Sequence, residues 1–468
     1  MVAWLAVGVL GSGAARANDL TRLYDLARAH DAILQEAQAQ RDALVEARPQ
    51  ALSALLPQLT ASGNAARQRI GVETYEVLTG PAGSTGPCSQ SVGSQTEYCT
   101  GDAHGYGLTL SQTLWSFAAF DKLREANAQV ASAEAALESA RQDLVLRVAQ
   151  AYFNILAAND QLATSRAARD GFGTLLNQAR GREQTGVGAR SDVEQAQAFF
   201  DGTAQGVIDA RNALDDAELA MTELAGVDAR DVALLREDIP LESPDPASMD
   251  AWVSSALADN PLVRSAQLAA DAAERDIGAQ QGRALPTLTL NGNATRTFQG
   301  PALGGDESED EVSLTVNWPL FQGGAVASSM RQSRALWHEA QAQLAQTQRD
   351  TERQTRAAYR NVVTGVERIT AARRAVESGQ QAVQASQRNV EFGTGDEFSL
   401  LTAQTNYYAA LSAYNQTRYD YLTALLTLKQ QAGRLSERDL AAIDALLVAR
   451  SAQSGGTRSG GAQADGTR

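Results

Sequence analysis

Two ten-residue stretches decide how this chain is organised: LPQLTASGNA at residues 56–65 and LPTLTLNGNA at residues 285–294. Further matches follow in the same order in both halves. The stretch from Gly186 to Gly226 corresponds to the stretch from Gly393 to Gly433. Self-similarity in a fixed order is the sequence signature of a repeated structural unit. The sequence therefore predicts a fold built from two copies of one unit.

The limits of the two copies follow from composition. We place the first repeat at residues 18–239 and the second at 248–450. The linker at 240–247 contains prolines that cannot continue a helix. Residues 1–17 have an apolar segment followed by an A-x-A-like cleavage site, which is typical of a secretory signal peptide. Residues 451–468 are rich in Gly, Ser and Arg, which predicts a disordered tail.

Each repeat is expected to hold one β-hairpin, at about 56–115 and about 286–321. From Thr287 to Phe298, Thr and Asn alternate with mainly apolar residues, and only Arg296 breaks the apolar face. The same period of two continues from Val312 to Leu320. This pattern is typical of outer-membrane strands, with one face toward lipid and one toward water. A half-buried sheet in a soluble domain would show the same alternation.

Long helices flank the hairpins. No proline interrupts the segments from Phe117 to Gly181 and from Ala325 to Glu391. Apolar residues three and four apart predict a coiled-coil seam on these helices, as in Leu123, Ala126, Val130, Ala133, Leu137, Ala140 and Leu144. A capping box at 191–194 predicts a new helix there. We therefore expect helical hairpins that turn near 181–191 and near 392–399.

Composition excludes several classes of function. The net charge of −15 argues against a nucleic-acid binder, which needs clustered Lys and Arg. Three histidines and two cysteines are too few for a zinc or iron–sulfur enzyme. The chain contains no phosphate-binding loop, nucleophile elbow or metalloprotease motif. We predict no enzymatic activity and no cofactor or metal.

An ordered set of short matches resembles the TolC family of outer-membrane efflux proteins. It comprises LTRLYDLA at 20–27, LLPQL at 55–59, NPL at 260–262, FGTG at 392–395 and RYDY at 418–421. The resemblance covers about residues 18–447. It implies a trimer in the outer membrane of a Gram-negative bacterium, with most of the chain in the periplasm. It also implies an exit duct that receives cargo from an inner-membrane transporter through a periplasmic adaptor, and exports proteins (type I secretion) or small toxic compounds.

The residues support the same assembly independently. Two hairpins supply four strands, which cannot close a barrel, and open strand edges are not tolerated in lipid. Three chains would supply twelve strands, an even number in the usual range. The predicted fold is therefore mostly α with a small β part: a coiled-coil α-helical barrel and a twelve-stranded barrel in outer-membrane lipid, shared by a homotrimer. The alternative is a periplasmic coiled-coil adaptor or scaffold, although no compact lipoyl-like β segment is evident.

The resemblance also locates a periplasmic constriction. Relatives narrow there to aspartates one helical turn apart, and those positions fall on Ser399 and Thr402. The equivalent position in the first repeat keeps Asp192. Asp396 and Glu397 lie just before the last long helix, where a helix dipole favours carboxylates. We expect an entrance closed by helix packing and hydrogen bonds, with modest cation selectivity.

Both cysteines lie in one predicted loop. From Pro57 to Leu108 there are 51 positions, against 28 between the matching residues of the second repeat. The extra segment, about 71–105, is expected to be an extended extracellular loop. Because exported proteins oxidise nearby thiols, we predict a disulfide between Cys88 and Cys99.

Overall fold

A computed structural model describes residues 19–72, 97–299 and 306–448 of the 468-residue chain. The predicted signal peptide at 1–17 and the predicted tail at 451–468 lie outside these ranges, as does Cys88 of the predicted disulfide. Those three expectations therefore stay predictions.

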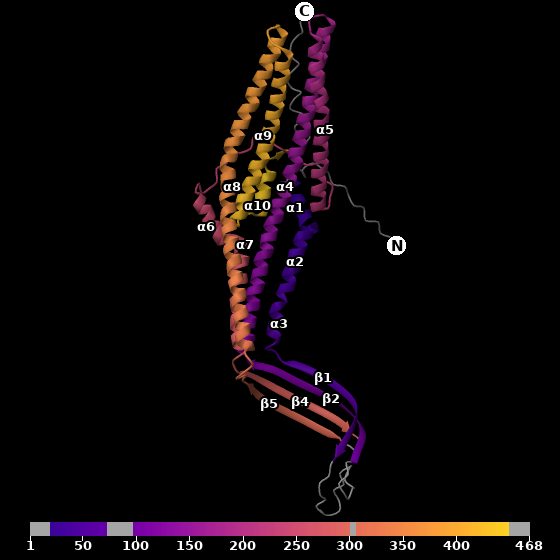
Figure 1. The fold of residues 1–468 in the computed structure, drawn as a ribbon, viewed down its shortest axis with the longest axis vertical. Helices are drawn as coiled ribbons and strands as arrows, with labels where there is room; N and C mark the ends of the chain where they lie inside the picture. The colour runs from indigo at the N-terminus through magenta and orange to yellow at the C-terminus, as the bar shows by residue number, and fades with distance from the viewer. Residues whose placement is uncertain (1–18, 73–96, 300–305, 449–468) are drawn as a thin grey trace, which may run out of the picture. The chain divides into compact units, whose positions relative to one another are not determined.

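The described chain is mainly helical, with a small antiparallel sheet, as the sequence predicts (Figure 1). The helices are α1 (Asp19–His30), α2 (Ala32–Val45), α3 (Ala47–Ser53), α4 (Phe117–Gln184), α5 (Arg190–Ala225), α6 (Met249–Asp259), α7 (Pro261–Gly282), α8 (Ala325–Glu391), α9 (Glu397–Gln431) and α10 (Glu437–Asp444). The strands are β1 (Gln58–Val72), β2 (Glu97–Trp115), β3 (Leu234–Leu235), β4 (Thr287–Gln299), β5 (Glu307–Asn317) and β6 (Leu447–Val448).

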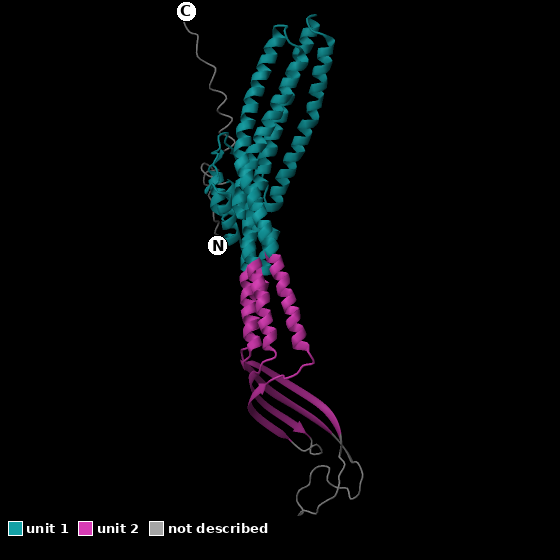
Figure 2. Ribbon diagram, turned by 60° about the vertical axis from the view of Figure 1, so that its left-hand side comes forward, with its two compact units in different colours: residues 1–40, 134–265, 345–468 teal, residues 41–133, 266–344 magenta. Residues whose placement is uncertain are grey.

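The chain divides into two compact units, coloured separately in Figure 2. Unit 1 comprises residues 1–40, 134–265 and 345–468, and unit 2 comprises residues 41–133 and 266–344. Each unit takes segments from both halves of the sequence. The compact units are therefore not the two predicted repeats, because each repeat contributes chain to both units.

Unit 2 contains the four-stranded sheet, with strand order β1-β2-β4-β5 and antiparallel pairing throughout. Its polar face carries cross-strand hydrogen bonds. The Ser111 hydroxyl donates to Asn291 at 3.3 Å, and the Asn291 amide donates to Thr315 at 3.2 Å. The opposite face is apolar and exposed, with Leu59, Leu108, Val312, Leu314 and Val316 all at least 49% accessible. The predicted period of two therefore corresponds to two chemically distinct faces.

The first hairpin lies within the predicted limits of about 56–115, but its strands are longer than expected. The expected loop at about 71–105 is in part sheet, because β1 continues to Val72 and β2 already begins at Glu97. Ladder pairing extends to Val72 opposite Glu97. The Gly and Thr content of this stretch suggested a loop, but the paired backbone hydrogen bonds of a twisted hairpin tolerate both residues.

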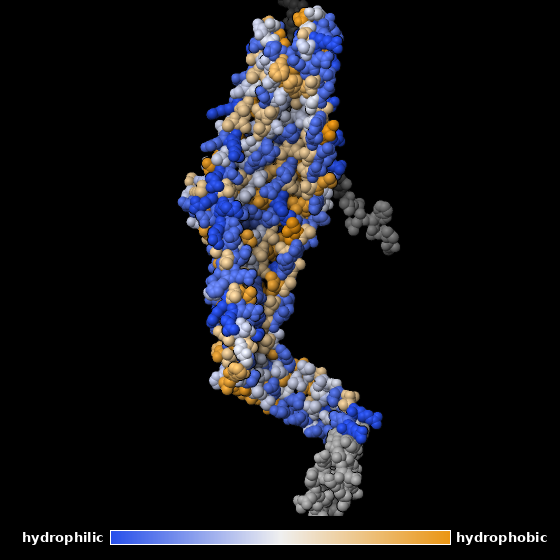
Figure 3. All heavy atoms as spheres, in the orientation of Figure 1, coloured by the Kyte–Doolittle hydropathy of each residue, from blue (hydrophilic) through white to orange (hydrophobic). Residues whose placement is uncertain are grey.

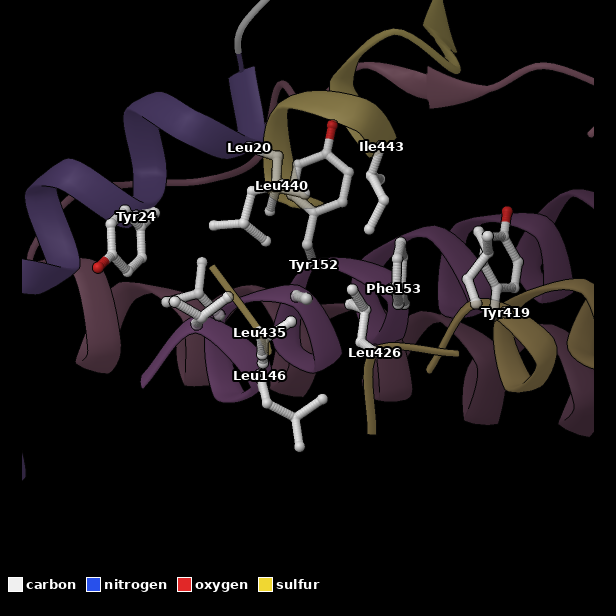
Figure 4. Close-up of a cluster of buried hydrophobic side chains, with 14 of the residues drawn as sticks. Leu20, Tyr24, Leu146, Tyr152, Phe153, Tyr419, Leu426, Leu435, Leu440 and Ile443 are labelled. Carbon is white, nitrogen blue, oxygen red and sulfur yellow. The ribbon is translucent and has the colours of Figure 1, made fainter. Parts of the chain in front are cut away.

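The core of unit 1 forms where α4 meets the short helices α1 and α10 (Figure 4). Leu20 from α1 and Leu440 and Ile443 from α10 lie around Tyr152 on α4, and Tyr24 from α1 belongs to the same cluster. All five side chains are buried. Burial of a large apolar side chain contributes about 1.5–3 kcal/mol, so this cluster anchors the N-terminal helix on the long one.

Buried polar side chains fix the ends of several helices in unit 1. The Asp444 carboxylate accepts hydrogen bonds from the backbone N–H groups of Leu20 and Thr21, both at 2.9 Å, at the start of α1. The Asn260 side chain caps α7 by accepting from the N–H of Leu262 at 2.8 Å, and its amide donates to the carbonyl of Gln431 at 2.9 Å. The NPL stretch at 260–262 thereby ties the start of α7 to the end of α9.

The two longest helices have the predicted limits to within three residues. They are α4, with 68 residues, and α8, with 67. Along the predicted seam of α4, Ala126, Ala133, Leu137 and Leu144 are buried, which agrees with a packing role for the alternating small and large residues.

None of the helices within the described ranges combines the length and the apolar sequence that crossing a membrane requires.

Candidate functional site

Two helical turns in unit 1 have the same backbone geometry. In the turn between α4 and α5, the N–H groups of Val187 and Gly188 both donate to the carbonyl of Arg182 at 3.0 Å. In the turn between α8 and α9, the N–H groups of Thr394 and Gly395 donate to the carbonyl of Asn389 at 2.8 and 3.0 Å. The two turns match position for position at an offset of 207 residues, which is the offset between the stretch from Gly186 to Gly226 and the stretch from Gly393 to Gly433.

Glycine is required at the same place in both turns. Gly186 and Gly393 have φ values of +75° and +70°, a left-handed conformation that other residues adopt only with strain. A Cβ at Gly188 would lie 2.9 Å from the Cβ of Arg182, and one at Gly395 would lie 2.8 Å from the Cβ of Asn389. The glycines of these turns therefore set the geometry at which the following helices begin.

The start of α5 differs in detail from the prediction. Ala189, not Ser191, is the N-cap residue, and α5 begins at Arg190. The Asp192 carboxylate accepts the backbone N–H of Ala189 at 3.4 Å. The four-residue pattern pointed to Ser191 because Ser is a preferred cap, but the glycine turn places the helix start two residues earlier. Asp192 therefore supplies the acidic half of a capping box from the first helical turn.

The start of α9 uses the complementary half of the same motif. Asp396 is the N-cap residue, and its carboxylate accepts the backbone N–H of Ser399 at 2.6 Å and the Ser399 hydroxyl at 3.0 Å. The Ser399 backbone hydrogen bond holds the pKa of the Asp396 carboxyl below its usual range. Ser399 occupies the position equivalent to Asp192. The carboxylate therefore lies in the first helical turn of α5 but at the N-cap position of α9. A helix start is an ordinary place for such a carboxylate.

Glu397 differs from its neighbours because it is buried. Its side chain is only 3% accessible and forms an ion pair with the guanidinium of Arg182, near the end of α4. Its Oε1 atom is buried without a hydrogen-bond partner among the described residues. Burial raises the pKa of Glu397, the charge of Arg182 opposes that rise, and the charge of Asp192 adds to it.

A cluster of buried apolar side chains follows Glu397 closely in sequence and connects α9 to α4 and α5. Leu400 and Leu401 on α9 pack with Phe172 and Ala179 on α4 and with Ala196 on α5. All five side chains are buried. The ion pair and this apolar cluster together join the α4–α5 hairpin to the α8–α9 hairpin within unit 1.

Thr402 lies in a shallow hollow of about 330 Å³ between α8 and α9. The hollow is also lined by Gly379, Phe398 and Ser399. It contains no ionisable side chain, and the described residues nowhere bring three His, Cys, Asp or Glu side chains together as a metal ion would need.

The structure brings all five predicted residues to the beginnings of α5 and α9, but gives them different roles. Asp192 and Asp396 cap helices, Glu397 forms a buried ion pair, and Ser399 and Thr402 line the hollow. Sequence reasoning missed Arg182. Its pairing with Glu397 spans 215 residues, and only the packing of α9 against α4 brings the two together.

Comparison with known proteins agrees with this architecture. The profile of the family described as outer membrane efflux protein matches residues 23–227 and 252–434. Outer membrane protein TolC of Vibrio cholerae is 29% identical over 447 residues, which cover 94% of this chain and 96% of that protein. Alkaline protease secretion protein AprF of Pseudomonas aeruginosa is 28% identical, covering 74% of this chain and 73% of that protein. The solved structure of the outer-membrane channel OprN superposes with a TM-score of 0.75 at 20% identity, covering 90% and 91% of the two chains.

This chain belongs to the outer membrane efflux protein family. It is an outer-membrane channel protein for export, and its location is the outer membrane. The comparisons thereby confirm the family, the fold class, the function and the location that the sequence predicts.

Proposed function

We propose that this chain forms the exit duct of a tripartite export system as a homotrimer. The observation that carries the proposal is the sheet of unit 2. It exposes one apolar face and one polar face, and its outer strands β1 and β5 each leave an edge that no strand of the described residues pairs with. Unpaired backbone groups cannot remain exposed in lipid. Three copies would join β5 of one chain to β1 of the next and close twelve strands into a barrel.

The partners would be a periplasmic adaptor and, through it, an inner-membrane transporter. The two helical turns support a docking role, because each presents an exposed apolar side chain. Val187 is 81% accessible and Phe392 is 79% accessible. Large apolar side chains at the tips of helical hairpins contribute nothing to the core of the chain, and they can be buried by a partner.

The cargo would be either proteins or small toxic compounds. The name of AprF describes secretion of an alkaline protease, and the name of the matched family describes efflux. A duct that serves either task needs no catalytic residues and no cofactor, and we assign none to this chain.

The periplasmic entrance would lie at the starts of α5 and α9, at Asp192, Ser399 and Thr402. A trimer gathers three copies of each residue around one axis. Asp192 and Asp396 both cap helix starts and keep accessible carboxylates, whereas Glu397 is buried and paired with Arg182. Ser399 and Thr402 carry no charge, so the ring has no stacked pair of aspartates on α9. The electric field that attracts cations grows with the number of negative charges gathered at a constriction. Because few carboxylates are gathered here, we expect modest cation selectivity.

Planar-bilayer conductance tests the entrance. The purified protein should conduct, show weak cation preference, and be little affected by micromolar trivalent cations added on the periplasmic side. Strong block that survives Asp192→Asn would show that the constriction lies elsewhere.

A cellular experiment tests the function itself. Deleting the gene should abolish release of an exported protein or raise sensitivity to toxic compounds, and the chain should fractionate with the outer membrane as heat-modifiable oligomers. The alternative, a periplasmic adaptor or scaffold, predicts a chain released with the periplasmic fraction.

A further inference from the structure

The arginines of the described strands and the glutamates of β5 lie on opposite faces of the sheet. The arginines of the described strands in this sheet, Arg67, Arg69 and Arg296, all share the face of Leu59, Leu108 and Val312. The glutamates of β5, Glu307, Glu309 and Glu311, all lie on the opposite, polar face. Figure 3 shows hydrophilic residues gathered at the end of the sheet that adjoins the grey residues. Both sets belong to this end, away from α3, α4 and α7.

The register places Arg296 just inside the outer edge of an apolar band, and Arg67 and Arg69 beyond that edge. On the apolar face of β4, Leu288 and Phe298 are ten residues apart, which is about 33 Å along a strand. With the usual tilt of about 40° this corresponds to about 25 Å of height, the thickness of the apolar band of an outer-membrane protein. Arg296 is therefore at the edge of the band.

Aromatic residues mark the same depth. The rings of His104 and Phe298 stack at 5.3 Å, and the rings of Tyr106 and Phe298 are 6.1 Å apart. Tyr106 is directly opposite Arg296 in the register and is 59% accessible. Aromatic rings collect where acyl chains meet headgroups. Arg67 and Arg69 lie farther along β1, at the depth of the headgroups.

Two acidic residues, Asp102 and Asp310, lie on the same face as the arginines. They do not occupy all the N–H donors of Arg67. Asp310 pairs with Arg296 at 2.9 and 3.0 Å, which holds the one arginine nearest the acyl chains. Asp102 approaches only Nε of Arg67, at 3.7 Å, and both side chains are more than three-quarters accessible. Such an exposed pair is weak. The guanidinium of Arg67 has further donors in a geometry that matches phosphate oxygens.

We propose that the end of the apolar face formed by Arg67, Arg69, Arg296, His104 and Tyr106 binds the phosphate groups of lipids in the outer leaflet of the outer membrane. Arginines on the lipid side attract anionic headgroups, and the aromatic rings hold the adjoining acyl chains. The glutamates of β5 face the polar side, where they do not repel these headgroups. This inference rests on the proposed function, because it requires the sheet to span the membrane.

Native mass spectrometry of the purified full-length protein can test the proposal. The protein is titrated with bis-phosphorylated lipid A and, separately, with the same lipid lacking both phosphates. We expect tighter binding of the phosphorylated lipid. In Arg67→Gln/Arg69→Gln the preference should fall roughly fivefold for each arginine, in line with the effect of one basic residue near an anionic lipid surface.

Two further variants make the result specific. Glu307→Gln/Glu309→Gln/Glu311→Gln removes three charges from the opposite face and should leave the preference unchanged. Arg296→Gln/Asp310→Asn removes the ion pair without leaving a lone charge beside the acyl chains, and should weaken binding less than loss of Arg67 and Arg69. Equal binding of both lipids by the wild-type protein, or an undiminished preference in Arg67→Gln/Arg69→Gln, would overturn the proposal.

Conductance separates this inference from the proposed function. Protein that inserts and conducts in planar bilayers but shows no phosphate preference would refute only the lipid site. Protein that neither inserts nor conducts would refute the exit duct, and the lipid site with it.

Discussion

Several carboxylates of unit 1 are each held by a specific set of donors. Asp31 is 5% accessible, and its oxygens accept two hydrogen bonds from the guanidinium of Arg147 at 2.8 and 2.9 Å. It also accepts the backbone N–H of Leu34 at 2.7 Å, which caps the start of α2. One side chain thereby fixes both the beginning of α2 and its position against α4. The hydrogen bond from Arg147 is the main reason that the pKa of Asp31 is lowered.

Substitution of Asp31 should be strongly destabilising. Asp31→Asn leaves Arg147 with Asp143 as its remaining partner at 2.9 Å and weakens the cap of α2. Because Arg147 is partly accessible, we expect a loss of about 2–4 kcal/mol, toward the lower part of the range for broken buried pairs. Chemical denaturation of the solubilised protein followed by circular dichroism measures this loss.

The pH dependence of the Asp31 effect has a definite sign. A lowered pKa in the folded state means that the stabilisation is present above the ordinary aspartate pKa of about 4 and is lost as the pH falls through the folded value. The stability difference between wild type and Asp31→Asn should therefore shrink below about pH 4. A difference that grows on acidification would contradict this assignment.

Glu397 should show the opposite pH dependence. Its pKa is raised by burial, so the folded chain holds this proton more tightly than the unfolded chain does. Its contribution to stability is present at acid pH and is lost as the pH rises through the raised value. Glu397→Gln mimics the protonated form, so its stability relative to wild type should increase as the pH rises above about 4.5.

Thermal unfolding of both Glu397 forms between pH 4 and pH 8 is the measurement. If the stability of the wild type instead increases relative to Glu397→Gln as the pH rises, then the attraction of Arg182 has a larger effect on the pKa of Glu397 than burial has. Arg182→Gln is the matched variant, because it removes the opposing charge and should steepen the wild-type pH dependence.

At the level of single residues, the sequence predicted that Asp192, Asp396 and Glu397 lie at helix starts, but not which groups they contact. Asp192 and Asp396 lie at the beginning of segments in which apolar residues recur with the period of a helix. Such a local pattern is enough to place both residues at helix starts. The partners of Asp31 and Glu397 are 116 and 215 residues away. No local pattern encodes that distance, because it depends on which helices pack together.

Among the secondary-structure elements, α8 and α9 are held in register by glycine–tyrosine contacts. A Cβ at Gly365 would lie 3.2 Å from Cδ2 of Tyr421, and one at Gly379 would lie 3.3 Å from Cα of Tyr407. The two glycines are fourteen residues apart on α8, and the two tyrosines are fourteen apart on α9, which is two heptads of an antiparallel pair. Each glycine lets α9 approach α8 closely at that position, where a larger side chain would keep the two helices farther apart.

Alanine substitutions distinguish this packing role from helix propensity. An exposed helical glycine replaced by alanine normally stabilises by about 0.8–1 kcal/mol. At Gly379 the new Cβ meets backbone that cannot move away, so we expect Gly379→Ala to destabilise by about 1–2 kcal/mol. Gly206→Ala on α5 is the matched control, since nothing lies within 4 Å of its Cβ position, and it should stabilise. Equal effects of the two substitutions, measured by denaturant unfolding, would refute the register argument.

The limits of helices were more predictable than those of strands. Unbroken proline-free segments fix α4 and α8, since a helix continues until a glycine turn ends it. The far ends of β1 and β2 were missed because Gly, Ser and Thr are compatible with both loop and paired strand. Pairing with the neighbouring strand, which the local sequence does not show, decides between them.

At the scale of the whole molecule, the repeat was predictable but the compact units were not. The repeat is visible as similar sequence in a fixed order, and the two helical turns with equivalent hydrogen bonds are its structural counterpart. The units instead follow which segments pack together, and each takes chain from both halves. The proposed trimer would complete what the described residues of one chain leave open, namely the outer edges of β1 and β5 and the exposed apolar face of the sheet.

The oligomeric state in detergent tests the central claim most directly. Light scattering of the protein extracted from outer membranes should give three chains of at most 49.6 kDa each, and conditions that separate the chains should also unfold the sheet. A folded, monodisperse species with the mass of one chain would contradict the account, because it would show that a single chain can satisfy its own strand edges and exposed faces.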